Sequence, residues 1–206
     1  MSKKVLYVKG SPSMGGSKSQ KVADAFIEAY KLANPTDEII EKDLFQIDIP
    51  YIDTDLLNGW TKYGNGEAPT EIEASKVAKH AAFTEEFFAA DKLILQTSMW
   101  NLSVPTQVKG YLDTLMVAGK TFAYTENGPK GLATDKKAIH IHGAGSVYSN
   151  TTGIEHSDSF VRSILGFMGV DLAPTIWVEG IDANPDQKET IMAKAIQKAE
   201  EAAKSF

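Results

Sequence analysis

Small residues and hydroxyl groups are concentrated in one short run near the start of the chain, GSPSMGGSKS at residues 10–19. An apolar helical pattern follows, so the run would lie at a helix N-terminus, where unpaired backbone N–H groups and the helix dipole favour an anion. Neither GxGxxG nor GxxxxGK(S/T) occurs, which argues against a dinucleotide or nucleoside triphosphate loop. A mononucleotide with one terminal phosphate, such as FMN, is the remaining fit. The alternative is a plain connection in which Ser17 only caps the helix.

The residues of this run that could contact a phosphate are small or carry a hydroxyl, and one is a cation. They are Gly10, Ser11, Ser13, Gly15, Gly16, Ser17, Lys18 and Ser19.

Two later segments could hold a flat ring system. The first follows an apolar strand and supplies an aromatic ring, a thioether and an amide, which suit stacking and hydrogen bonding to an isoalloxazine. Its residues are Ser98, Met99, Trp100, Asn101 and Leu102. The second would let the backbone approach a ring closely, and consists of Gly143, Ala144, Gly145 and Ser146. The alternatives are that Met99 and Trp100 belong to the core, and that residues 143–146 form a simple turn.

Apolar patterning predicts five strands that alternate with five helices. The strands are short runs at residues 5–8, 38–42, 92–97, 138–142 and 175–179. Helices are expected after Ser17, from Thr70 to about Ala90, from Pro105 to about Ala118, from Asp158 to Met168, and after Asn184 and Pro185. Residues 43–69 are expected to be irregular, and residues 121–132, TFAYTENGPKGL, to be rich in turns.

This alternation predicts a doubly wound α/β fold, with a parallel sheet covered by helices on both faces. For five strands the flavodoxin-like order 2-1-3-4-5 is the natural choice, and ligands bind beyond the carboxyl ends of such strands. The three loops described above all follow predicted strands, so they would meet at this edge. All 206 residues suit a single domain.

Composition excludes several classes of function. The chain has no cysteine, which removes disulfides, thiolate nucleophiles and cysteine-ligated metals, so redox chemistry would need a bound cofactor. The net charge of −6 argues against a nucleic-acid surface. No apolar run approaches the roughly 20 residues that span a bilayer, and the start passes directly into a strand, so a cytoplasmic protein without membrane contact is expected.

The chain resembles the FMN-dependent NADH-azoreductases, flavodoxin-like homodimers that also reduce quinones. The resemblance covers nearly the whole chain and is closest in MWNLSVPTQVKGYLDTLMVAGKTFAYTENGPKGL at residues 99–132, in KKAIHI at residues 136–141, and in the pair Ser17 and Ser19. It implies that Ser11 and the run Ser17, Lys18, Ser19 hold the FMN phosphate, and that residues 99–102 and 143–146 hold the isoalloxazine. It also implies that Phe122, Tyr124 and Phe167 lie near the flavin of the partner subunit.

The resemblance further implies the function. NADH would be the electron donor, flat aromatic or quinone-like compounds and azo compounds the acceptors, and the order of reaction ping-pong, with FMN rather than a side chain carrying the chemistry. The alternative is a flavodoxin-type electron carrier without enzymatic activity. A serine hydrolase is disfavoured because no GxSxG is present.

Four histidines raise the question of a metal site. His140 and His142 lie two apart on a predicted strand, so both face the same side, but no HExxH or related spacing occurs. Packing and hydrogen bonding are therefore expected for this pair, and no metal.

Overall fold

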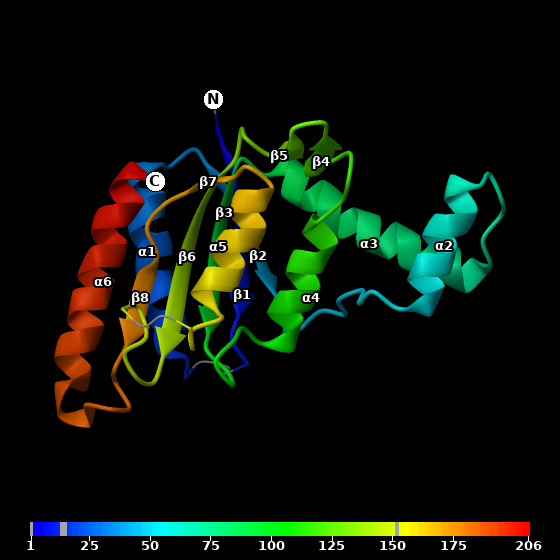
Figure 1. Ribbon diagram of the computed structural model, residues 1–206. Coiled ribbons are helices and arrows are strands. Elements are labelled where there is room, and N and C mark those ends of the chain that lie inside the picture. Colours follow the sequence, from blue (N-terminus) through cyan, green and yellow to red (C-terminus); the bar gives the residue numbers. More distant parts are fainter. Residues whose placement is uncertain (1, 13–15, 151–152) are drawn as a thin grey trace.

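A parallel β-sheet forms the centre of the computed structural model, which describes residues 2–12, 16–150 and 153–206 (Figure 1). Its order is β2-β1-β3-β6-β7, and β8 pairs with the same edge of β6 as β7 does, further along the strand. The strands are β1 (Lys4–Gly10), β2 (Glu38–Asp43), β3 (Lys92–Ser98), β6 (Lys137–Ala144), β7 (Asp171–Leu172) and β8 (Ile176–Glu179). The doubly wound parallel sheet that the sequence predicts is thus confirmed.

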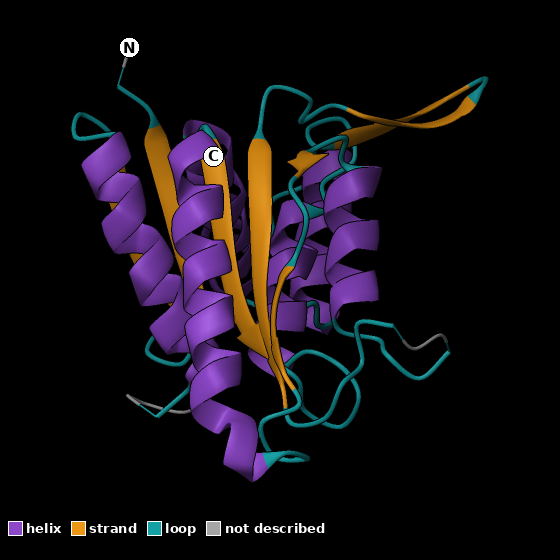
Figure 2. Cartoon of the chain, turned by 90° about the vertical axis from the view of Figure 1, so that its left-hand side faces the viewer, coloured by secondary structure: helices purple, strands orange, loops and turns teal. Residues whose placement is uncertain are grey.

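Helices cover both faces of this sheet, because side chains alternate along each buried strand. Val5 and Tyr7 of β1 pack with α1 (Lys18–Ala33) and α6 (Lys188–Ser205). Leu6 and Val8 pack into a second cluster, with α3 (Glu71–Ala89), α4 (Thr106–Leu115) and α5 (Asp158–Phe167). Figure 2 shows the helix that ends at the C-terminus in front of the sheet.

The five-stranded order 2-1-3-4-5 needs one correction at the sheet edge. The last predicted strand, 175–179, shares its position with β7, so the sheet has six strands. β7 pairs with Lys137 and Ala138 at the start of β6, whereas β8 pairs with its end. Pro174 lies between the two strands. Proline has no N–H to donate to the ladder, which accounts for the interruption.

The stretch 43–69 contains a helix, α2 (Thr54–Gly64), where we expected irregular chain. Asp53 caps it by accepting a hydrogen bond from the Leu56 N–H at 2.9 Å. Gly59 lies inside the helix because a Cβ there would come within 2.7 Å of Val77 on α3. This glycine therefore serves close helix packing and does not break the helix.

Residues 121–132 also differ from expectation, since they form an antiparallel hairpin of β4 (Phe122–Thr125) and β5 (Gly128–Gly131). The hairpin rests against the end of α5. A Cβ on Gly131 would come within 2.3 Å of the Gly169 nitrogen. Gly131 is thus needed for this close approach and does not mark a turn.

The local signals at helix starts hold elsewhere. Thr70 and Glu73 form the predicted capping box of α3. The helix after Pro105 begins at Thr106 and ends at Leu115, before the expected Ala118. Asn184 is an exception, because its side chain does not cap the last helix as its pairing with Pro185 predicts. The two residues begin a short 3₁₀ turn, Pro185–Gln187, and α6 starts at Lys188. None of the helices in the described residues combines the length and apolar content that crossing a bilayer requires.

Candidate functional site

The first turn of α1 presents two hydroxyl groups at the carboxyl end of β1. Ser17 caps the helix by accepting from the Gln20 N–H at 3.3 Å, and its Oγ lies 3.1 Å from Ser19 Oγ. The Ser19 Oγ accepts a hydrogen bond from Gln96 Nε2 on β3 at 2.7 Å. Both serines are buried. The sheet therefore holds this loop in place, while the N-terminal backbone N–H groups of α1 remain suited to an anion.

The loop after β3 adopts a strained conformation. Asn101 and Leu102 have φ angles of 50° and 66°, and two backbone hydrogen bonds join Trp100 to Ser103 across them. A left-handed leucine is rare, and such strain is concentrated at functional sites. The Trp100 side chain is 50% exposed, so the alternative that it is a core residue is wrong.

Hydrogen bonds join the three loops to one another. The Ser98 hydroxyl donates to Ser11 Oγ at 3.1 Å and accepts from the Trp100 indole N–H at 3.0 Å. The Met99 N–H donates to the Gly143 carbonyl at 2.7 Å. Because these bonds join the ends of three neighbouring strands, the loops form one continuous wall at the lower edge of the sheet in Figure 1.

One cleft is lined by all three loops, and a second cleft adjoins it. The first is lined by Ser11, Gly16, Ser17, Lys18, Ser19, Ser98, Met99, Trp100, Gly143, Ala144, Gly145, Val178 and Asp182. The second is lined by Met99, Asn101, Leu102, Gly145, Ser146, Tyr148, Asp182 and Ala183. The structure therefore brings together all twelve residues that we predict to contact FMN. Ser13 and Gly15 lie outside the described residues.

A fourth loop reaches the site, and sequence reasoning missed it. The loop after β8 supplies Asp182, whose backbone N–H donates to the Gly145 carbonyl at 3.0 Å. Its carboxylate forms an ion pair with the ammonium of Lys18. The available signal was its position directly after the last predicted strand, at the same sheet edge as the other loops.

The two central histidines belong to a buried polar network beside the cleft. Thr97 Oγ1 lies 2.7 Å from His140 Nε2 and 2.6 Å from His142 Nδ1. His140 Nδ1 lies 2.7 Å from a carboxylate oxygen of Asp158, which also accepts from the Thr175 hydroxyl at 2.7 Å. The structure thus places both rings in a hydrogen-bonded core. In the described part of the chain, no three His, Cys, Asp or Glu side chains are grouped to hold a metal ion.

Burial and hydrogen bonding shift the ionisation of this network. Burial holds the pKa of His142 well below its usual value, and the neighbouring His140 adds to the effect. Burial alone would raise the pKa of Asp158, but the hydrogen bonds from His140 and Thr175 outweigh it, and the pKa is lowered. The network therefore favours an ionised Asp158 and an uncharged His142.

The three aromatic residues predicted for a substrate pocket lie together, but apart from the cleft. The Phe122 ring centroid is 5.5 Å from that of Tyr124 and 5.0 Å from that of Phe167. They belong to the hairpin and to the end of α5, at the opposite end of the sheet from the cleft (Figure 1). Within one chain the structure therefore does not join them to the other predicted residues.

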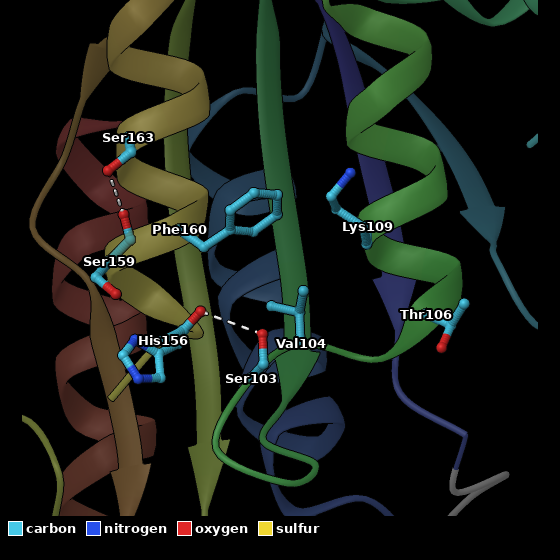
Figure 3. A pocket seen from close by; sticks show the side chains of 8 residues that line it. All are labelled: Ser103, Val104, Thr106, Lys109, His156, Ser159, Phe160 and Ser163. Carbon is cyan, nitrogen blue, oxygen red and sulfur yellow. Dashed lines mark hydrogen bonds between the residues drawn. The ribbon is translucent and has the colours of Figure 1, made fainter. Parts of the chain in front are cut away.

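A further cavity of about 580 Å³ lies between α4 and α5 (Figure 3). Its lining combines hydroxyl groups with Val104 and Phe160, and it begins directly after the strained loop. Lys109 contributes its stem, while its ammonium pairs with Asp113 at 2.5 Å. None of the cavity's described lining residues carries a carboxylate for acid–base chemistry. The lining residues are Ser103, Val104, Thr106, Lys109, His156, Ser159, Phe160 and Ser163.

Comparisons with known proteins identify the family to which the chain is similar. A family described as having a flavodoxin-like fold matches residues 3–203. An FMN-dependent NADH:quinone oxidoreductase of Staphylococcus carnosus is 44% identical over 205 residues, covering 98% of this chain and 99% of the relative. A protein of Bacillus anthracis named FMN-dependent NADH:quinone oxidoreductase 3 is 44% identical over 209 residues, with the same coverage.

Solved structures of azoreductases are also similar to this chain. A crystal structure of azoreductase from Bacillus anthracis superposes with a TM-score of 0.93 at 37% identity, covering 100% of both chains. An FMN-dependent NADH-azoreductase from Bacillus anthracis, solved in complex with FMN, superposes with a TM-score of 0.90 at 27% identity, covering 97% of each chain.

Proposed function

The chain belongs to the flavodoxin-like family of FMN-dependent NADH:quinone oxidoreductases and azoreductases, and on this basis we propose how its cleft performs that activity. It is an FMN-dependent oxidoreductase that uses NADH to reduce quinones and azo compounds. The observation that carries the proposal is the meeting of the three loops in one cleft at the carboxyl ends of the strands. When bound, FMN would supply the two-electron redox chemistry between NADH and the acceptor.

The residues present fit this cofactor. The N-terminus of α1, with the hydroxyls of Ser17 and Ser19, would bind the phosphate, and the Ser11 hydroxyl borders the same space. Glycine is required where the backbone closes on the cleft, because a Cβ at Gly143 would come within 2.9 Å of Ser19 Oγ. Glycine at this position thus lets the first turn of α1 pack directly against the end of β6.

The ring system would lie between the other two loops. Trp100 and Met99 offer apolar surface, and the backbone of residues 143–146 allows close approach. The left-handed turn at Asn101 and Leu102 fixes the direction of this surface. An open slot with one aromatic wall suits flat acceptors such as quinones and azo compounds.

We also propose that the enzyme is a homodimer whose second copy covers the cleft. Two exposed apolar side chains, Trp100 and Leu102, line the two clefts, and exposed apolar surface of this kind can mark a protein contact. The cavity between α4 and α5 continues this surface from Ser103. Phe122, Tyr124 and Phe167 could reach a flavin only in another subunit. We also propose that the protein is located in the cytoplasm, where NADH is produced.

Steady-state kinetics test the proposed order of reaction. One site that serves NADH and the acceptor in turn predicts parallel double-reciprocal lines when NADH is varied at several quinone concentrations. Intersecting lines would require both substrates to be bound together and would contradict the ping-pong order. The electron-carrier alternative is not supported, because the relatives at 44% identity are named as oxidoreductases.

Replacing Ser17 with alanine tests the phosphate assignment. Hydrogen bonds to charged groups contribute about 1.5–3 kcal/mol, so we expect Ser17→Ala to raise the Kd for FMN by about ten- to a hundredfold. Quenching of flavin fluorescence on titration with apoprotein measures this. Riboflavin, which lacks the phosphate, is the control and should bind both proteins alike. An unchanged FMN Kd would place the phosphate elsewhere.

A further inference from the structure

We propose that Asp182 is a specificity determinant that weakens phosphate recognition in this cleft, so that the protein distinguishes FMN from riboflavin less strongly than its serines and lysine would allow. The inference rests on the proposed function, because it concerns how the same cleft binds a flavin. It is carried by an ion pair across the rim of the cleft between Asp182 and Lys18.

The backbone places Asp182 firmly at the rim. Gly180, with a φ angle of 82°, turns the chain after β8, and the N–H groups of Asp182 and Ala183 both donate to the Gly145 carbonyl, at 3.0 and 3.3 Å. A Cβ on Gly145 would come within 2.6 Å of an Asp182 carboxylate oxygen. The Asp182 carboxylate is therefore held against Gly145, in the loop that follows β6.

Lys18 is the cation that a phosphate would meet at this end of the cleft. It is the first residue of α1 and lies between Ser17 and Ser19. Among the described residues that line the cleft, Lys18 is the one cation and Asp182 the one carboxylate. Both side chains keep contact with water, with exposed fractions of 35% and 68%.

Simple electrostatics then give the direction of the effect. A phosphate monoester carries a charge of about −1.5 to −2 at neutral pH. The Asp182 carboxylate both repels this charge and neutralises the lysine that would attract it. An asparagine at position 182 would keep the size and the backbone hydrogen bonds but remove both effects. Because the pair is partly exposed, salt should screen the difference.

The test compares flavin binding by wild type and Asp182→Asn apoproteins, using fluorescence quenching with FMN and with riboflavin at low and high salt. Asp182→Asn should lower the Kd for FMN by about three- to tenfold at low salt and leave the riboflavin Kd unchanged. The gain should shrink at high salt. Asp186→Asn is the matched control, since it makes the same change in net charge on the next turn of chain without lining the cleft.

Several results would overturn the inference. An unchanged or higher FMN Kd for Asp182→Asn would contradict it directly. Equal tightening of FMN and riboflavin would mean that Asp182 acts on the ring and not on the phosphate. Equal tightening by Asp186→Asn would assign the effect to net charge. A wild-type protein that binds neither flavin would instead contradict the proposed function.

Discussion

Replacing Gly143 with valine is expected to raise the Kd for FMN at least a hundredfold. A Cβ at this position would lie 2.9 Å from Ser19 Oγ and 3.0 Å from Ser19 Cβ. Valine would therefore push away the first turn of α1 and project its methyl groups beside the cleft. Overpacking of this kind also costs about 1–3 kcal/mol of folding free energy. Flavin retained through gel filtration and the apoprotein Kd are the measurements.

The control for this variant is Gly64→Val, at the end of α2, where a Cβ would have no heavy atom within 4 Å. That variant should retain FMN like wild type. A thermal melt of both apoproteins separates lost binding from lost folding. If folded Gly143→Val bound FMN with the wild-type Kd, residues 143–146 would not border the flavin.

Replacing Asp158 with alanine is expected to lower the free energy of unfolding by about 1–3 kcal/mol, the usual cost of leaving buried hydrogen-bonding groups without a partner. The carboxylate accepts from Thr175 and contacts His140 Nδ1, both at 2.7 Å. Without it, His140 Nδ1 and the Thr175 hydroxyl lose a buried partner. Urea unfolding followed by tryptophan fluorescence measures the change.

The Asp158 carboxylate also determines which atoms of the network donate hydrogen bonds and which accept them. When His140 is neutral with its proton on Nδ1, Thr97 donates to His140 Nε2 and accepts from His142 Nδ1. Asp171→Ala, an exposed residue on β7, is the control and should change stability by less than about 0.5 kcal/mol. Equal unfolding midpoints for Asp158→Ala and wild type would show that the network does not stabilise the fold.

Most of the strands could be predicted from local signals in the sequence, but the separate short strand β7 could not. Apolar runs such as residues 92–97 are long and clear, and the pair Thr70 and Glu73 forms the capping box that its spacing indicates. Parallel sheets also bring the loops after their strands to one edge. The gathering of residues 99–102 and 143–146 at one cleft follows from that topology and not from their own conformations.

The remaining features depend on contacts between distant segments. Gly59 breaks the helical pattern of α2 in sequence, yet its close contact with Val77 is what requires glycine there. Gly131 likewise suggests a turn until Gly169 is seen against it. Asp182 is an ordinary loop residue in sequence, and its place in the cleft depends on two hydrogen bonds to Gly145. Composition and periodicity carry no information on such pairs.

The most direct test of the account is an anaerobic absorbance titration of the FMN-loaded protein with NADH. We expect one equivalent of NADH to bleach the bound flavin rapidly, and a quinone added afterwards to restore the oxidised spectrum. Bound flavin that NADH leaves oxidised would contradict the account, since the protein would then hold FMN without the oxidoreductase activity that we assign to it.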